Sequence, residues 1–280
     1  MSQAFDRIFI VMFENENASI VMQNPYFARL ATEGVRLTGY HGVTHPSQPN
    51  YLATIAGDFF GWADDNCKDF DDTNLVDLLE AKGVSWGVYV ENLPANKLQC
   101  TGPNVYAPPL YGHPLYYRKH NPFVSFTGNQ TAVRLAKIVD ATRFDPTAAP
   151  QFCWYAPNIA NCGHTVPHSH AAGGSIVNVN YAAGWLQPFL DPLLNNAAFM
   201  HGTLVVLTFD EDWPPVQPGQ PEHGLPTYTV LLGGMVHPGT TQSGAYTHYN
   251  LLATIEENFN LGSLGRHDKG AATFKFLWNG

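Results

Sequence analysis

Oxygen-bearing side chains follow directly after two apolar runs of this sequence. In an open sheet of largely parallel strands, ligands bind at the carboxyl ends of the strands. Two acid-containing pairs at that edge predict a metal site, although a single pair of this kind would more often cap a helix or form a solvated turn. The four predicted ligands are Glu14 and Asn15, which follow residues 7–13, and Asp210 and Glu211, which follow residues 203–209.

The ligand types indicate which ion the site would take. Carboxylate and amide oxygens are hard ligands, which favour one divalent Ca²⁺, Mg²⁺ or Mn²⁺ ion, with Zn²⁺ as the alternative. A third apolar run, residues 151–156, leads into His164. We assign His164 and His223 to proton transfer and His248 to substrate binding, although the ordinary interpretation of any one histidine is a satisfied polar group.

A serine lies where a Pro-flanked turn leads into an apolar stretch, residues 44–57. The plain interpretation of Ser47 is a helix N-cap. The alternative is a metal-bound nucleophile, because a nearby metal ion lowers the pKa of a hydroxyl and a helix N-terminus attracts phosphate. Asn50 adds an amide donor for the phosphate, and Thr44 is the second candidate nucleophile. With the carboxylates, these groups are the parts that phosphoryl transfer needs.

Short apolar, β-branched runs alternate with helix-like segments along the chain. This alternation predicts an α/β fold with a largely parallel central sheet and helices on both faces. We expect one domain over residues 1–280, with a lid-like, Pro- and Tyr-rich excursion near 92–130. The expected strands are 7–13, 35–39, 84–90, 151–156, 203–209 and 227–233, and the expected helices are 26–33, 49–56, 74–82, 131–138, 176–190 and 249–259.

Composition narrows the possible functions. The formal net charge of −9 argues against a nucleic-acid partner, because phosphate backbones are held by clustered Lys and Arg. The longest apolar runs are far shorter than the roughly 20 residues of a transmembrane helix. The first residues do not have the pattern of a signal peptide, so the protein is either intracellular or processed from a precursor. Four cysteines, Cys67, Cys100, Cys153 and Cys162, fit either disulfides or buried thiols.

Several segments together resemble one family. The runs FENENAS, THPSQPNYLATIAG, PNIANCGH, LTFDED and YTHYNLLATIEENFNL are similar, in this order, to the phosphoesterase family of acid phosphatases and phospholipases C. That family belongs to the alkaline-phosphatase superfamily, so the resemblance implies an alkaline-phosphatase-like fold. It also implies that Ser47 is the nucleophile and that the metal ligands include Glu14, Asn15, Asp210 and Glu211.

The same resemblance extends to basic residues and cysteines. Arg118, Lys119 and His120 resemble a basic stretch that would hold the phosphate, whereas the alternative is a solvated charge cluster. Cysteines at the places of Cys67 and Cys100 suggest a disulfide and therefore an exported protein. Where relatives commonly have Asn-Asp-x-His-Asp, this chain has Asn-Cys-Gly-His-Thr at residues 161–165. The loss of two carboxylates counts against a second metal ion and leaves Cys162 as a candidate partner of Cys153.

The residues and the resemblance predict a metal-dependent phosphoric monoester hydrolase that forms a phosphoserine intermediate. We expect a monomer that acts on a phosphorylated small molecule or lipid, because the aromatic segment 105–126 could line an apolar pocket. One alternative is a phosphodiesterase of the phospholipase C type. The other is a catalytically inactive relative that binds phosphate or lipid, against which the intact Ser47 and its acidic neighbours argue.

Overall fold

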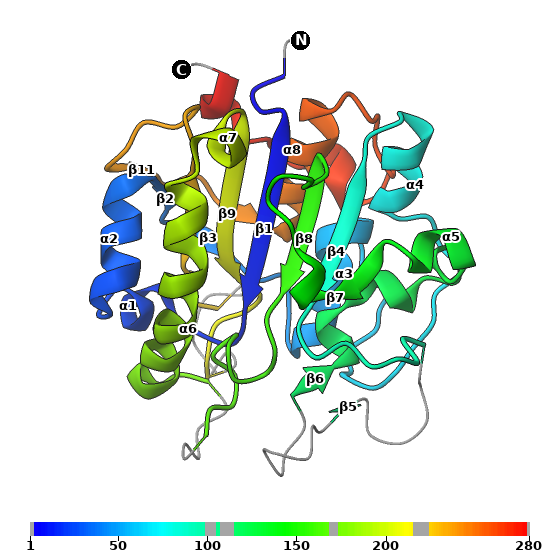
Figure 1. Cartoon of the computed structure of the whole chain (residues 1–280), viewed down its shortest axis with the longest axis horizontal. Helices are drawn as coiled ribbons and strands as arrows, with labels where there is room; N and C mark the ends of the chain where they lie inside the picture. Colours follow the sequence, from blue (N-terminus) through cyan, green and yellow to red (C-terminus); the bar gives the residue numbers. More distant parts are fainter. Residues whose placement is uncertain (1–2, 99–104, 107–114, 168–172, 215–223, 279–280) are drawn as a thin grey trace.

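The computed structural model describes residues 3–98, 105–106, 115–167, 173–214 and 224–278. Over these residues the chain forms an eight-stranded sheet between two layers of helices (Figure 1). The strands of this sheet are β1 (Arg7–Phe13), β2 (Val35–Leu37), β4 (Trp86–Val90), β7 (Ile138–Asp140), β8 (Phe152–Ala156), β9 (Thr203–Phe209), β10 (Thr229–Leu232) and β11 (Thr240–Gln242). Two small pairs are formed by β3 (Tyr40–His41) with β12 (Tyr246–Thr247) and by β5 (Val105–Tyr106) with β6 (Tyr116–Tyr117).

The sheet is mostly parallel, in the order β11-β2-β10-β9-β1-β8-β4-β7. The central strand β1 pairs in parallel with both β8 and β9. The exception is β10, which is antiparallel to β9 and to β2. The register between β1 and β9 sets Phe13 opposite Phe209, so the residues that follow the two strands emerge side by side.

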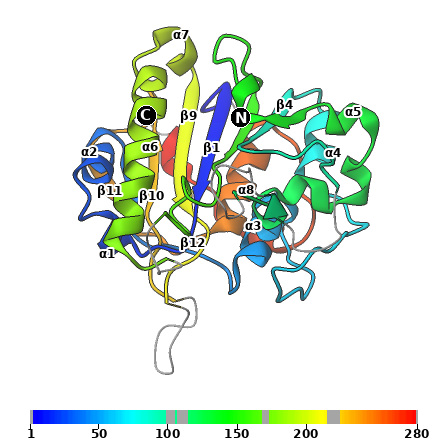
Figure 2. The ribbon, with the colours of Figure 1, turned by 60° about the horizontal axis from the view of Figure 1, so that its bottom comes forward.

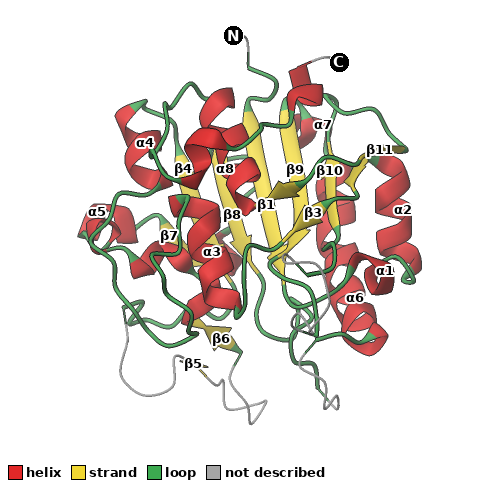
Figure 3. Cartoon of the chain, turned by 180° about the vertical axis from the view of Figure 1, so that it is seen from behind, coloured by secondary structure: helices red, strands yellow, loops and turns green. Residues whose placement is uncertain are grey.

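Helices cover the two faces of the sheet with separate hydrophobic cores. On one face lie α2 (Pro25–Glu33), α6 (Ile176–Leu194) and α7 (Ala197–Met200), and on the other lie α3 (Ser47–Ala56), α4 (Leu75–Ala81) and α8 (His248–Asn258) (Figures 1 and 3). Asn24, Asn74 and Ser175 begin α2, α4 and α6 by accepting hydrogen bonds from first-turn backbone N–H groups. The remaining helices are α1 (Ala18–Val21), α5 (Ala132–Leu135) and the 3₁₀ helices η1 (Arg118–His120), η2 (Pro122–Ser125), η3 (Thr127–Asn129), η4 (Ala141–Arg143), η5 (His267–Gly270) and η6 (Lys275–Trp278).

The predicted fold class is confirmed, and each of the six predicted strands contains an observed strand of the main sheet. The predicted helix over residues 131–138 is wrong in its second half. Here α5 ends at Leu135, and the chain then forms the edge strand β7, which pairs in parallel with β4. A three-residue edge strand depends on its partner across the sheet, so the local pattern of residues does not reveal it.

The second half of the predicted excursion packs as part of the domain. Phe123, Val124 and Phe126 are fully buried in the core beneath α3. Residues 99–104 and 107–114, where the predicted lid would reach farthest, lie outside the described residues. The excursion is therefore anchored by a buried segment, and its role as a lid stays a prediction.

Cysteines and helices of the structure bear on the predicted disulfides and on the predicted absence of a transmembrane helix. Cys153 and Cys162 are free, buried thiols, so the pairing considered for them is wrong. Cys100 lies outside the described residues, so the Cys67–Cys100 disulfide stays a prediction, and with it the export of the protein. Within the described part of the chain, no helix has the length and apolar character required to cross a membrane.

Candidate active site

Three elements bring the predicted site residues to one end of the sheet. The strands β1 and β9 run in the same direction and end together, which places Glu14 and Asn15 beside Asp210 and Glu211. The backbone N–H of Asn15 donates a hydrogen bond to Asp210 Oδ1 at 3.0 Å. These strand ends lie at the bottom of Figure 1, and Figure 2 brings this end forward, with α3 beside it. The first residue of α3 is Ser47.

The hydroxyl of Ser47 is surrounded by acidic and amide oxygens. Its Oγ lies 3.0 Å from Glu14 Oε2 and 3.0 Å from Glu211 Oε1, and it lies 3.5 Å from Asn15 Oδ1. Only 1% of this residue is exposed. One hydroxyl proton cannot satisfy three acceptors at once, so the cluster holds more acceptors than donors. A cation among these oxygens would remove the imbalance.

The buried carboxylates repel one another. Burial raises the pKa of Asp210 well above its usual range, and the charges of Glu14 and Glu211 raise it further. Burial also raises the pKa of Glu211. Asp210 Oδ2 is buried and accepts no hydrogen bond from the described part of the chain. This excess of negative charge and the unused oxygen fit a site for a positively charged ligand.

The residues fit a divalent ion of the hard class. Oxygen atoms of Glu14, Asn15, Asp210 and Glu211 and the Ser47 hydroxyl form the available donor set, which contains neither thiolate nor imidazole. Across the described residues, no three side chains of His, Cys, Asp or Glu alone form a metal-binding group.

Lys119 supplies a positive charge on the other side of Ser47. Its Nζ donates hydrogen bonds to Ser47 Oγ at 3.1 Å and to Asp65 Oδ2 at 2.8 Å. Burial by itself would lower the pKa of Lys119, but the charges of Glu14 and Asp65 outweigh burial and raise it. The raised pKa favours the charged form of Lys119, which places a positive charge beside the Ser47 hydroxyl.

Two histidines lie near this cluster in different environments. His120 Nε2 lies 2.9 Å from Glu14 Oε1, and its ring stacks between Tyr51 and Tyr117. The ring of His164 lies 6.4 Å from that of His120, measured between centroids. Burial lowers the pKa of His164 to about 4, so this imidazole is neutral at ordinary pH.

Sequence reasoning missed His45 and Asp65 and did not assign a role to Asp212. His45 Nδ1 lies 2.5 Å from Glu211 Oε2, and its Nε2 lies 3.3 Å from Asp212 Oδ1. Burial alone would lower the pKa of His45, but Asp212 and Glu211 together raise it to about 9. The position of His45 two residues before Ser47 was the available signal. Asp65 is separated from its partner Lys119 by more than fifty residues, so only the tertiary structure reveals that pair.

Ser47, Thr44 and Asn50 lie close together in sequence but have different surroundings. Pro46 is the N-cap of α3, so the interpretation of Ser47 as the cap is wrong. The Thr44 hydroxyl donates to the His45 carbonyl at 3.3 Å. The Asn50 amide holds the turn before Ser47, because its Oδ1 accepts from the backbone of Val43 and Thr44 and its Nδ2 donates to the Thr44 carbonyl. Its predicted contact with phosphate stays untested.

The remaining predicted residues have other contacts. The Arg118 guanidinium donates to Asp69 Oδ1 and to the Val124 carbonyl. The sequence assigned His248 to the substrate, but its ring lies between the Tyr40 hydroxyl and the Asp210 carbonyl, behind the acidic cluster. His223 lies outside the described residues. Of the basic stretch 118–120, Lys119 and His120 therefore reach the cluster, whereas Arg118 ties this segment to its neighbours.

The chain is similar to several known phosphatases. It is 36% identical to an acid phosphatase of Aspergillus fumigatus over 99% of this chain and 60% of that protein. It is also 36% identical to a probable acid phosphatase of Kluyveromyces lactis, over 99% of this chain and 63% of that protein. A phosphatidylinositol-3-phosphatase of Mycobacterium tuberculosis is 29% identical over 93% of this chain and 79% of that protein. The chain thus spans somewhat less than two thirds of the length of the two acid phosphatases.

Solved structures share the fold at low sequence identity. A protein in the alkaline phosphatase superfamily from Vibrio parahaemolyticus superposes with a TM-score of 0.60 at 13% identity, covering 99% of this chain and 72% of that one. The phosphonate monoester hydrolase of Agrobacterium radiobacter gives 0.59 at 13% identity, with 98% and 77% covered. The model of the Phosphoesterase family matches residues 21–262. The chain therefore belongs to the Phosphoesterase family.

Proposed function

We propose that this protein is a metal-dependent phosphoric monoester hydrolase in which Ser47 is the nucleophile. The observation that carries the proposal is the environment of one buried hydroxyl. Ser47 Oγ contacts Glu14 and Glu211 on one side and the Lys119 ammonium on the other, all within 3.1 Å. A serine in a purely structural role has no need of two carboxylates and a protonated lysine, whereas a serine that becomes an alkoxide does.

The donor set around Ser47 supports a divalent ion that prefers oxygen ligands. Glu14, Asn15, Asp210, Glu211 and the Ser47 oxygen would hold one divalent ion, with Ca²⁺, Mg²⁺ or Mn²⁺ favoured and Zn²⁺ as the alternative. When bound, such an ion lowers the pKa of a ligated hydroxyl and neutralises charge on a phosphoryl group.

The residues of the chain then carry out two displacements at phosphorus. Ser47 Oγ gives up its proton and attacks the phosphorus, a bond from phosphorus to Oγ forms, and the bond to the leaving alcohol breaks as that oxygen takes up the proton that Ser47 released. Lys119 and His120 hold the negative oxygens of the phosphoryl group during this step. In the second step water gives up a proton and attacks the phosphoserine, the bond between phosphorus and Ser47 Oγ breaks, and Ser47 Oγ takes up that proton. His164 is neutral at ordinary pH, so its imidazole can accept a proton.

The relatives support a monoester substrate. Two of them are named acid phosphatases and a third a phosphatidylinositol-3-phosphatase, so the substrate of this chain would be a phosphorylated small molecule or a phosphorylated lipid. The chain is shorter than these acid phosphatases, and the proposal for its substrate rests on the site described above together with these names.

The test compares Ser47→Ala with Thr44→Val, a matched loss of the neighbouring hydroxyl. We expect turnover of p-nitrophenyl phosphate to fall by at least about 10⁴-fold in Ser47→Ala and to stay within about threefold in Thr44→Val. Each protein is assayed after chelation and after Ca²⁺, Mg²⁺, Mn²⁺ or Zn²⁺ is returned. Normal turnover by Ser47→Ala would refute the nucleophile, and full activity after chelation would refute the metal. Preference for bis-p-nitrophenyl phosphate would indicate a phospholipase C-type diesterase.

A further inference from the structure

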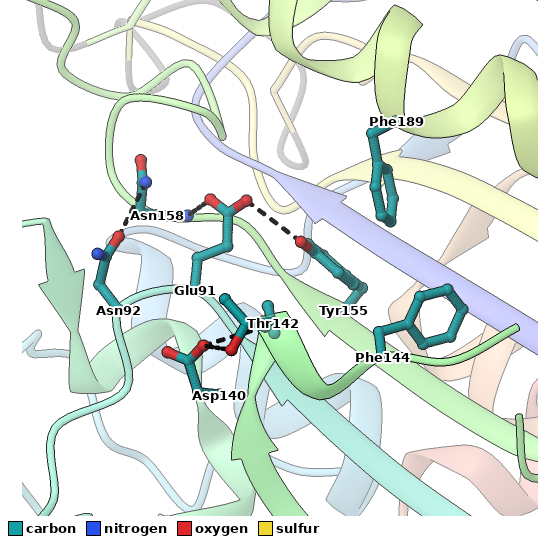
Figure 4. A pocket seen from close by; sticks show the side chains of 9 residues that line it. Glu91, Asn92, Asp140, Thr142, Phe144, Tyr155, Asn158 and Phe189 are labelled. Carbon is teal, nitrogen blue, oxygen red and sulfur yellow. Dashed lines mark hydrogen bonds between the residues drawn. The ribbon is translucent and has the colours of Figure 1, made fainter. Parts of the chain in front are cut away.

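A second cavity lies at the carboxyl ends of β4, β7 and β8, apart from the Ser47 cluster. It has a volume of about 420 Å³ (Figure 4). Its polar side includes Glu91, which follows β4, and Asp140, the last residue of β7. Its aromatic side includes Tyr155 of β8 and Phe189 of α6. Both belong to the hydrophobic core on the face of the sheet that α6 covers, whereas α3, which carries Ser47, packs on the opposite face. None of the residues that line it belongs to the proposed catalytic set.

The cavity is negatively charged. Glu91 and Asp140 line it, and among the described residues that line it there is no Lys, Arg or His. Burial raises the pKa of Tyr155, and the charges of Glu91 and Asp140 raise it further, which shows that both carboxylates act on the same space. An anion such as a phosphate would be repelled here. A ligand with positive charge would be attracted.

The hydrogen-bond partners of Glu91 restrict the kind of cation. Its Oε1 accepts from the Tyr155 hydroxyl at 3.2 Å, and its Oε2 accepts from the backbone N–H of Asn158 at 2.9 Å and from Asn161 Nδ2 at 2.7 Å. Because protein donors already occupy both oxygens, little capacity remains for the N–H groups of a primary amine. Burial raises the pKa of Glu91, because the charged carboxylate is poorly solvated, and a bound cation would favour the charged form.

Three aromatic side chains line the cavity together with the carboxylates (Figure 4). The centroids of Tyr155 and Phe189 lie 4.6 Å apart, and that of Phe144 lies 6.3 Å from each of them. Phe144 and Phe189 are only partly buried, so these rings are accessible from the cavity. Aromatic faces attract cations, above all those that carry methyl groups in place of N–H donors.

We propose that this cavity binds a small quaternary ammonium group, held by the charges of Glu91 and Asp140 and by the rings of Phe144, Tyr155 and Phe189. The volume lies in the range of small-ligand pockets, roughly 300 to 1,000 Å³. This proposal stands apart from the proposed hydrolase activity, because it uses none of the same side chains.

The experiment measures binding of choline and tetramethylammonium to the wild-type protein by titration calorimetry and ligand-observed NMR. The neutral control is the carbon isostere of choline, in which a tert-butyl group replaces the trimethylammonium group. We expect choline and tetramethylammonium to bind, and the isostere to bind at least about tenfold more weakly. Equal binding of the isostere, or no binding of either cation, would overturn the proposal.

Matched variants place the binding in this cavity. Asp140 and Asp145 make the same turn, because each accepts from the N–H and hydroxyl of the threonine two residues later. Only Asp140 lines the cavity. We expect Asp140→Asn and Phe189→Leu each to weaken choline binding by about tenfold, Asp145→Asn to leave it unchanged, and all three to retain hydrolysis of p-nitrophenyl phosphate. Choline affinity that survives in both Asp140→Asn and Phe189→Leu would place the binding elsewhere and refute the assignment.

Discussion

Replacement of Lys119 by methionine tests whether the protonated lysine stabilises negative charge at Ser47. The change keeps the length of a buried side chain and removes its ammonium group, which lies 3.1 Å from Ser47 Oγ and 2.8 Å from Asp65. Asp65 is partly exposed and can be solvated after the change. The variant should therefore fold, and the principal loss should be a positive charge next to the reacting oxygen.

The size of the effect follows from the distance. Two unit charges separated by 3.1 Å attract each other by about 5 kcal/mol at an effective dielectric constant of about 20, which is an upper limit. Removal of one donor that stabilises charge in a transition state typically lowers kcat by about 10²- to 10³-fold, or about 3 to 4 kcal/mol. We expect Lys119→Met to lower kcat by this factor, with a smaller change in KM.

The assay is steady-state hydrolysis of p-nitrophenyl phosphate with saturating metal, together with thermal unfolding to show that the variant is folded. The control is Lys68→Met, because Lys68 is exposed and lies over the Trp62 ring, 5.6 Å from its centroid. That control should keep wild-type kcat. A folded Lys119→Met protein whose kcat stays within about threefold of wild type would show that Ser47 reacts without help from this charge.

Three further variants test other features of the structure. Burial and the nearby Asp268 raise the pKa of Glu256 from 4.5 to about 8 in the folded protein, so the wild type loses stability as pH rises from about 4.5 to 8. Glu256→Gln resembles the protonated form of Glu256. In urea unfolding the variant should be more stable than wild type by on the order of 1 to 4 kcal/mol at pH 9, and equally stable below pH 4.5. The same difference in stability at both pH values would contradict the raised pKa. Gly173→Ala should lower activity at least about tenfold, because a Cβ there would lie 2.6 Å from Asn15 Cβ and Gly173 has φ +106°. The control is Gly184→Ala, which should keep full activity because its Cβ would have no atom within 4 Å. The two variants are assayed in parallel, and full activity of Gly173→Ala would show that Asn15 tolerates displacement. Arg118→Met should lower the free energy of unfolding by about 1 to 3 kcal/mol, because the hydrogen bonds to Asp69 and Val124 are lost, and KM should change less than about threefold. A large rise in KM without loss of stability would show that Arg118 binds the substrate.

Local sequence patterns were sufficient for the main strands and for the acidic ligands. Apolar runs such as residues 203–209 are buried on both faces of the sheet, so their composition identifies them as strands without any knowledge of their partners. Glu14 and Asp210 could be grouped in advance because parallel strands end at a common edge. The edge strands β7 and β11 could not be recognised, because most of their residues are not buried and each pairs on one side only, with a strand distant in the chain.

The tertiary structure decided which polar groups meet. The contact of Lys119 with Ser47 and Asp65 joins three separate segments, and the position of His248 behind Asp210 joins the last long helix to the end of β9. The cavity between Glu91, Asp140 and Phe189 likewise arises only when β4, β7 and α6 come together. Residue types and spacing reveal chemistry that lies within one segment or at one predicted sheet edge, whereas contacts between distant side chains depend on packing, which a single sequence does not display.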